Sequence, residues 1–355
     1  MIKKLKLIPI FFILFLFPNK DSLYSQDHKG SHLQQVKSSL FSYLIGSINK
    51  GIVPGVSLSI YQSSSKVFDF NNGIDSKTGL GIASVTKPFT AFAILKLVEQ
   101  NFVNLDEPIS TYLKFNLENS KYKNNPITIR HLLQHTSCLP FRGSGKLYAI
   151  NKREFYIPTQ ICKSGSKHIY SNSNYNLLLA IVETVTGNTY KNYVHKSIFG
   201  PLEMKNSNAS RSNGAGGIIS TSQDLAHFAE MMANEGVYKN RIILSRKLLS
   251  QMFQKPTYTE DVYSFYALGW RVKKNMEGQI DYVYHTGIWK DSLCEIRFFP
   301  KQKAYYVQLS NPKNYETKKI NSYRKTVTEL ATHIVAVLNK MKPIAKLGLQ
   351  NIQRL

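Results

Sequence analysis

The amino-acid sequence predicts an α+β fold in which strands near both ends of the chain form one sheet. Alternating apolar residues indicate strands at 56–60 and 66–70, and again at 282–285, 293–299 and 304–309. Between these two groups, apolar residues recur three and four positions apart, which is typical of amphipathic helices. The order of the segments therefore predicts a sheet flanked by terminal helices, with a helical lobe inserted between its two halves.

The predicted helices have recognisable starts and stops. Gly187 follows the last periodic residue of one helix, and another runs between Ser222, a candidate N-cap, and Gly236, a candidate C-cap. Helices are expected at 33–48, 89–98, 127–133, 174–186, 222–236 and 322–338. Residues 140–168 are polar and irregular, so they receive no assignment.

Length and composition are those of a globular protein with a substantial core. The chain has 355 residues, of which 43% are apolar and 12% aromatic. It contains no internal repeat and no linker long enough to divide it. We therefore predict a single domain over 26–342 and leave 343–355 as an unassigned C-terminal tail.

The N-terminus has the pattern of an export signal. Three lysines precede an apolar run over 7–17, which is too short to span a bilayer comfortably as a helix. Leu23-Tyr24-Ser25 fits a cleavage site, so residues 1–25 are expected to be removed and the protein to act in the periplasm or at the cell surface. If residues 1–25 are retained, they would instead tether the protein to a membrane.

The chain is strongly basic, with a formal net charge of +24 at pH 7. An exported basic protein would associate with anionic membrane surfaces or wall polymers, although a lysine-rich genome would give the same composition. Nucleic acid is not an expected partner, because the lysines are scattered and no recognition motif is present. Cys138, Cys162 and Cys294 permit at most one internal disulfide, and the first two are the closest pair in sequence. None of them has metal-ligand spacing, so neither a metal nor another cofactor is expected.

Ser84 and Lys87 are the strongest candidates for a catalytic pair. They lie three residues apart at a predicted helix start, so the Lys87 amine can reach the Ser84 hydroxyl and draw off its proton. The helix N-terminus adds backbone donors where an oxyanion would form. Seven serines have a lysine at this spacing, and an exposed lysine one turn beyond the serine is the simpler interpretation for most. Ser84 differs because a strand-like approach over 77–81 precedes it and a long amphipathic helix follows.

Tyr170 and Asn172 form a second candidate motif, Tyr-Ser-Asn. A phenol and a carboxamide on alternate positions point the same way from an extended or turning segment. A phenol close to a lysine ammonium can have a lowered pKa and carry protons, and Asn172 could hold a substrate amide. Tyrosine with asparagine two residues later occurs elsewhere in the chain, so a tyrosine packed in the core is the alternative.

His285-Thr286-Gly287 is the third candidate motif and lies at the end of a predicted strand. The triplet occurs once, and it would line a cleft edge with a histidine donor, a hydroxyl and a residue without a side chain. Lys77-Thr78-Gly79 is similar but lies just before Ser84, where it fits the strand that leads into the nucleophile.

These segments together resemble the serine β-lactamase and penicillin-recognising hydrolase superfamily. The chain looks like the branch of class C β-lactamases, DD-peptidases and esterases, in family order from about Gly51 to Asn311. The resemblance is carried by Pro54-Gly55, ASVTKPFTAFAILKLVEQ, LDEPI, ITIRHLLQHTSCLP, YSNSNYNLLLAIVETVTG, IFGPLEM, GAGGIISTSQDLAHFAEMM, ALGW and YHTG. It implies a β-lactamase/transpeptidase-like fold, with an antiparallel sheet flanked by terminal helices and an inserted helical lobe.

The resemblance also implies a role for each motif. Ser84 would be acylated, Lys87 would accept its proton or activate it electrostatically, and Tyr170 would act as general base and acid. Asn172 would contact the substrate amide. Backbone N–H groups of Ser84 and Ile288 would form the oxyanion hole.

The sequence also departs from the pattern of that superfamily. Cys138 replaces a glycine in the HTSGLP stretch of the relatives, so that turn is expected to be altered or tied to Cys162. His285 and Gly287 would bind substrate, with His285 where many relatives carry lysine, and an uncharged histidine binds carboxylates weakly. Bulky residues at 288–291 replace a small, glycine-rich segment and would narrow the acyl pocket, which disfavours β-lactam hydrolysis.

The predicted function is that of an exported serine hydrolase that forms an acyl-enzyme at Ser84 on an amide or ester. Its substrate would be a D-amino-acid peptide of the cell wall or a small ester. One alternative is an authentic class C-type β-lactamase. The other is a non-catalytic wall- or membrane-binding protein that retains the fold.

Overall fold

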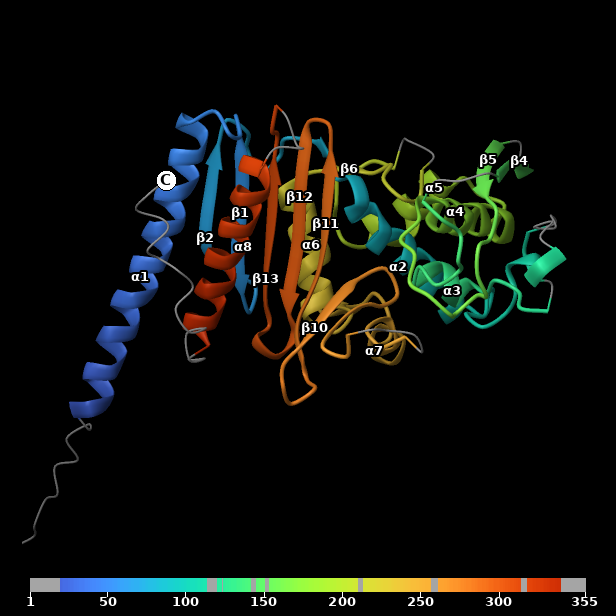
Figure 1. Ribbon diagram of the computed structural model, residues 1–355. Helices are drawn as coiled ribbons and strands as arrows, with labels where there is room; N and C mark the ends of the chain where they lie inside the picture. Colours follow the sequence, from blue (N-terminus) through green and yellow to red (C-terminus); the bar gives the residue numbers. More distant parts are fainter. Residues whose placement is uncertain are drawn as a thin grey trace, which may run out of the picture.

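The computed structural model describes residues 20–113, 120–122, 124–141, 145–150, 153–209, 213–256, 261–313 and 318–339 (Figure 1). Its main element is a seven-stranded sheet in which every neighbouring pair is antiparallel. The strand order is β2 (Ser65–Asn72), β1 (Val56–Gln62), β13 (Ala304–Ser310), β12 (Ser292–Phe299), β11 (Ile280–Trp289), β10 (Arg271–Lys274) and β9 (Ser264–Tyr266). The predicted sheet built from both ends of the chain is confirmed.

Two terminal helices cover one face of this sheet. The helices α1 (Lys20–Asn49) and α8 (Lys318–Leu338) lie side by side against it (Figure 1). The apolar faces of the two helices pack against the strand residues on this face of the sheet. Together they form one core, which includes Leu40, Leu44, Ile60, Val327 and Ile334. None of the described helices is long and apolar enough to cross a bilayer.

The other face of the sheet carries α6 (Ser222–Ala233) and, beside it, the helical lobe (Figure 1). The lobe contains α2 (Thr86–Glu99), α3 (Ile129–Leu133), α4 (Asn172–Thr186) and α5 (Tyr190–Val194), with a π-helical turn over His195–Phe199. A second core joins the lobe to the sheet, and Phe89, Phe228 and Trp270 are buried in it. The predicted inserted helical lobe is therefore confirmed.

Several boundaries differ from the sequence expectations, for local reasons. The α6 N-cap is Thr221 rather than Ser222, because the Thr221 hydroxyl accepts from the Asp224 N–H at 3.1 Å. The unassigned stretch 140–168 contains a hairpin of β4 (Gly145–Ile150) and β5 (Arg153–Pro158). The strand predicted to end at His285 continues to Trp289, since β12 pairs with it along that length.

The remaining described elements are short. Three-residue 3-10 helices occupy Ala83–Val85, Ile109–Thr111, Ser120–Tyr122 and Pro300–Gln302. Two-stranded pairs form between β3 (Leu80–Gly81) and β6 (Ile219–Ser220), and between β7 (Val237–Tyr238) and β8 (Arg241–Ile242); α7 spans Arg246–Met252. The apolar run at 7–17 and the tail from 343 lie outside the described residues, so the predicted export signal and tail stay predictions.

Candidate active site

The nucleophile candidate lies where the helical lobe meets the sheet. Ser84 is half-buried within the 3-10 turn that leads directly into α2. The turn is reached through Ala83, whose φ of 47° is in the left-handed region that non-glycine residues seldom adopt. The 3-10 turn that contains Ser84 packs directly against strand β11.

Lys87 is fully buried one turn after Ser84. Its Nζ donates to Ser84 Oγ at 3.1 Å and to the backbone carbonyl of Ala215 at 2.9 Å. Burial lowers the pKa of Lys87 to about 7, because the charged amine is cut off from water. The predicted Ser84–Lys87 contact is therefore present, and the amine is poised between its two protonation states near neutral pH.

Tyr170 completes a compact group with these two residues. The Ser84 side chain hydrogen-bonds the Tyr170 hydroxyl, and Lys87 Nζ lies 4.8 Å from the centre of the Tyr170 ring. Burial raises the pKa of Tyr170, and the bond to Ser84 and the charge of Arg271 only partly offset it. The lowered pKa expected from a neighbouring lysine is therefore wrong. Tyr170 is therefore protonated at neutral pH, so its hydroxyl must donate a proton before it can accept one.

Asn172 opens helix α4 and is exposed. The preceding Ser171 is extended and buried, so the three residues of the motif turn from a strand-like segment into the helix. Asn172 thus remains accessible to a substrate, whereas the neighbouring Asn174 is buried and used in the packing of the lobe.

Gly287, the glycine of the third motif, packs closely against the backbone at Ile82 and Ser84. A Cβ built on Gly287 would lie 2.1 Å from the Ile82 carbonyl oxygen and 3.2 Å from the Ser84 nitrogen, so only glycine lets β11 approach this closely. This approach places the backbone of Gly287 next to the Ser84 nitrogen, and Ile288, the other predicted oxyanion-hole residue, follows directly on β11.

His285 is buried and differs from the accessible cleft donor that the sequence predicts. Its Nε2 contacts the Tyr266 hydroxyl at 3.1 Å, and its Nδ1 contacts the Thr286 carbonyl at 2.9 Å. Because the carbonyl can only accept, Nδ1 carries the proton and Nε2 accepts from Tyr266. Burial and the nearby charge of Lys87 hold the pKa of His285 well below its usual value. The imidazole is therefore neutral at neutral pH.

The bulky residues Ile288 and Trp289, which follow His285-Thr286-Gly287, lie in two different environments. The Ile288 side chain packs against the core under the terminal helices, since it alternates with Gly287 along the strand. Trp289 is 56% exposed at the end of β11. The Ile288 side chain thus lies on the sheet face opposite Gly287 and is not a wall of the acyl pocket.

His135 is a site residue that sequence reasoning missed. Its Nδ1 accepts from the Ser171 N–H at 3.2 Å and from the Asn174 amide at 3.0 Å, while its ring centre lies 4.2 Å from that of Tyr170. Its Nε2 is buried and has no hydrogen-bond partner among the described residues. The HTSCLP stretch that contains His135 was noted only as part of the family resemblance. No pattern in the neighbouring sequence indicates that His135 contacts Tyr170.

The loop that contains His135 is cross-linked to the segment that leads into Tyr170. Cys138 and Cys162 form a disulfide, as the sequence allowed. Parallel to it, the Ile161 N–H donates to the Cys138 carbonyl at 3.0 Å and the Ile169 N–H donates to the His135 carbonyl at 2.7 Å. These bonds fix the two segments against each other just before Tyr170.

Replacing His135 by alanine is expected to lower the rate of Ser84 acylation by about tenfold to a hundredfold, because Tyr170 loses its ring contact and its neighbours lose an acceptor. His135→Asn should retain much of the rate. An asparagine oxygen can replace Nδ1, and asparagine tolerates the φ of 57° found at this position. Labelling rates with a fluorophosphonate measure both, with His333→Ala on α8 as control. Equal losses in the two His135 variants would contradict a positioning role.

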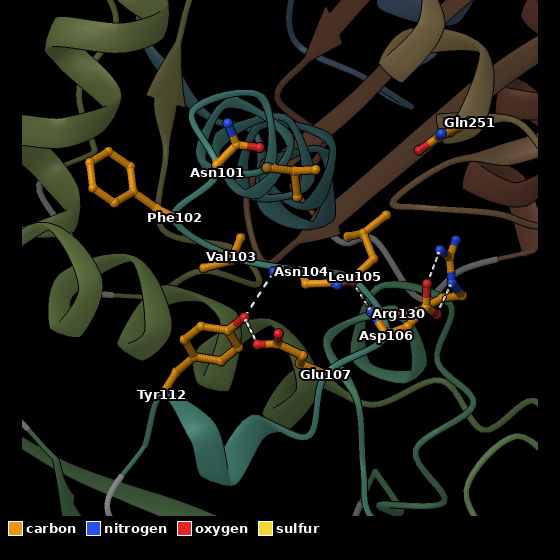
Figure 2. Close-up of a pocket in the computed structure, with 11 residues that line it drawn as sticks. Asn101, Phe102, Val103, Asn104, Leu105, Asp106, Glu107, Tyr112, Arg130 and Gln251 are labelled. Carbon is orange, nitrogen blue, oxygen red and sulfur yellow. Dashed lines mark hydrogen bonds and ion pairs between the residues drawn. The ribbon is translucent and has the colours of Figure 1, made fainter.

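A separate pocket of about 550 Å³ lies away from this site, between the end of α2 and the segment that contains Leu105-Asp106-Glu107 (Figure 2). Each of its charged groups has a partner within the pocket lining. Arg130 binds both oxygens of Asp106 at 2.6 and 2.7 Å, and Tyr112 donates to Glu107. None of the predicted site residues lines it, so we interpret its polar groups as structural.

Comparison with known proteins identifies the class of protein that this fold and site define. The family model described as Beta-lactamase matches residues 41–329, so the chain belongs to the β-lactamase family. Protein flp of Staphylococcus aureus (strain MW2) is 27% identical over 349 residues, which cover 83% of this chain and 68% of that protein. The D-alanyl-D-alanine-carboxypeptidase/endopeptidase AmpH of Escherichia coli (strain K12) is 24% identical over 292 residues, covering 70% of this chain and 76% of AmpH.

Solved structures confirm the fold. The octameric penicillin-binding protein homologue from Pyrococcus abyssi superposes with a TM-score of 0.69 at 23% identity, covering 89% of this chain and 80% of that one. A class C β-lactamase gives 0.67 at 18% identity, covering 87% and 97%. The protein thus has the β-lactamase/transpeptidase-like fold of a family whose members include hydrolases.

Proposed function

We propose that this chain is a serine hydrolase that cleaves amides or esters through an acyl-enzyme at Ser84. The observation that carries the proposal is the position of Lys87. Its Nζ lies 3.1 Å from Ser84 Oγ, at a site where burial brings its pKa to about 7. An amine with that pKa is about half neutral at neutral pH, so it can accept a proton and return it within one cycle.

In acylation, Ser84 Oγ bonds to the substrate carbonyl carbon while the hydroxyl proton moves to Lys87 Nζ. The backbone N–H groups of Ser84 and Ile288 would stabilise the negative carbonyl oxygen. When the intermediate collapses, the substrate C–N or C–O bond breaks and the leaving group takes the Tyr170 proton. Lys87 then returns its proton to Tyr170, which fits a phenol whose pKa is raised by burial.

Deacylation uses the same groups with water as the nucleophile. The water oxygen bonds to the acyl carbon, and one water proton passes to Lys87, directly or through Tyr170. The bond between that carbon and Ser84 Oγ then breaks, and the serine oxygen takes the proton back. The products are a free acid and the original hydroxyl.

Two observations bear on substrate and location. AmpH is named as a D-alanyl-D-alanine-carboxypeptidase/endopeptidase, which supports a D-amino-acid peptide of cell wall, with a small ester as the other candidate. The basic N-terminal region followed by an apolar run supports action after export, and a net charge of +24 supports association with anionic wall or membrane. A purely binding role would leave the desolvated Lys87 beside Ser84 without a use.

The direct test is labelling of purified mature protein with a fluorophosphonate and with a fluorescent penicillin, followed by mass spectrometry of the Ser84 peptide. Hydrolysis of a cephalosporin, a D-Ala-D-Ala peptide and a short-chain ester then ranks the substrates. If Ser84 remains unmodified while the protein binds purified cell wall, the hydrolase proposal is wrong and the binding role replaces it.

The pH dependence of acylation is expected to follow Lys87. The neutral amine is the proton acceptor and its pKa is about 7, so the rate should fall about tenfold per pH unit below pH 7 and level off above it. The pKa values of His135 and His285 lie well below the usual histidine range, so neither should titrate in that window. Fluorophosphonate labelling between pH 5 and 9 measures the profile. If the fall in acylation rate below pH 7 is absent in His285→Gln, the titrating group is His285 rather than Lys87.

A further inference from the structure

Two histidines lie next to each other where the terminal helices α1 and α8 meet. His32 of α1 and His333 of α8 have ring centres 5.4 Å apart. The Nε2 atoms of both rings are buried and lack a hydrogen-bond partner in the described part of the chain. Buried polar atoms are nearly always paired with protein, water or an ion, so two such nitrogens on adjacent rings indicate a further ligand.

The separation of the two rings matches that of imidazoles bound to one metal ion. Zinc lies about 2.0–2.1 Å from each ligating nitrogen and prefers tetrahedral geometry, which puts the centres of two ligating rings about 5 Å apart. Burial and the neighbouring His32 lower the pKa of His333. The His333 ring is therefore neutral at neutral pH and keeps a lone pair for a metal ion.

Helix α1 contains a third histidine at a spacing typical of helical metal sites. His28 lies four residues before His32, so the two positions share one face of α1, one turn apart. Two histidines at this spacing bind one zinc ion in H-E-x-x-H helices. Zinc takes at least three protein ligands, and the described side chains alone include no group of three, so the site depends on His28 to complete it.

The histidines lie where the described apolar packing of α1 begins. Leu33 is the first of the described α1 side chains that packs in the core under the terminal helices. Figure 1 shows the first turns of α1 projecting past the end of α8. An ion held by His32 and His333 would therefore join the two helices at the point where the projecting part of α1 reaches the rest of the molecule.

We propose that His28, His32 and His333 bind one divalent transition-metal ion, such as zinc, and that this ion clamps α1 to α8. Imidazole nitrogen suits zinc, copper and nickel, whereas magnesium takes oxygen ligands. The role of the ion is structural, because α1 and α8 cover the sheet face opposite α6 and the helical lobe (Figure 1). The proposal does not depend on hydrolase activity.

The test is calorimetric titration with Zn²⁺ and, separately, with Mg²⁺. The protein is prepared without a polyhistidine tag and freed of metal with a chelator. We expect one zinc ion per chain at this site and no binding of magnesium. When zinc is at about a hundredfold its dissociation constant, the melting temperature should rise by about 4 °C.

His32→Gln and His333→Gln should each abolish this binding, and His28→Gln should weaken it by at least about tenfold. His227→Gln is the matched control. It removes one imidazole from α6, where His227 Nδ1 contacts the Leu202 carbonyl, and it should bind zinc as the unmodified protein does. Glutamine is polar and favours helix, so the metal-free variants should melt within about 2 °C of the metal-free parent.

The proposal is overturned by zinc binding that persists in His32→Gln or His333→Gln, by its absence in the unmodified protein, or by an equal loss in His227→Gln. A second measurement needs no variant. The anomalous scattering of zinc in crystals of the unmodified protein should locate one ion between the His32 and His333 rings. An ion found only elsewhere, such as beside His135, would contradict the assignment.

Discussion

Replacing Ser84 by alanine should abolish formation of the acyl-enzyme and lower hydrolysis by about four orders of magnitude or more, because no other group in the site can form the covalent bond. The fold should be unaffected. Ser84 is half-buried, its side chain hydrogen-bonds Lys87 and Tyr170, and alanine is compatible with the helical turn.

The measurement is fluorophosphonate labelling and ester hydrolysis, with thermal unfolding to establish that the variant is folded. Ser47→Ala is the matched control, since Ser47 has the same spacing to a lysine but lies on α1, where its hydroxyl donates to the Tyr43 carbonyl. Residual turnover within tenfold of the parent, or a label that persists in Ser84→Ala, would show that the nucleophile is misassigned.

Replacing Lys87 by methionine is expected to lower acylation by about a thousandfold, within the range usual for loss of a general base. Stability should not fall with it. The amine is fully buried, and an apolar chain of similar length removes the cost of burying a charge. A loss of activity together with an unchanged or raised melting temperature therefore identifies a catalytic rather than a structural lysine.

Lys87→Arg separates the two roles left open for this residue. Arginine keeps a positive charge near Ser84 but cannot release its proton at neutral pH, so it can activate electrostatically and cannot act as the base. We expect Lys87→Arg to be as inactive as Lys87→Met, in a protein shown to be folded. An arginine variant that retains activity would assign Lys87 an electrostatic role and place the base elsewhere.

The sequence was informative wherever the signal is local. Strand alternation and helix periodicity depend on neighbouring residues, so β1, β2, β12, β13, α4 and α8 fell close to their predicted ranges. In contrast, α1 begins at Lys20 rather than at residue 33, and β9 and β10 were not predicted. Ser84 and Lys87 were found for the same reason, since one helical turn fixes their distance. The hairpin at β4 and β5 was missed, although buried Phe155 and Ile157 alternate with exposed Glu154 and Tyr156 along β5.

Properties set by tertiary contacts were not predictable from the chain. The protonated state of Tyr170 depends on burial by segments far apart in sequence, so a local rule about a nearby lysine gave the wrong direction. The burial of His285 depends on its contact with Tyr266, which lies on another strand. The role of His135 likewise arises only when its loop meets Ser171 and Asn174.

The Cys138–Cys162 disulfide makes the structure beside the site dependent on the oxidation of two cysteines. It joins two segments 24 residues apart whose contact precedes Tyr170, and closing a loop of that length stabilises a folded protein by about 3 kcal/mol. A molecule that folds where thiols stay reduced lacks this stabilisation beside its proton carrier. We therefore expect full activity only after Cys138 and Cys162 have been oxidised to the disulfide. Activity would then depend on the redox environment in which the protein folds.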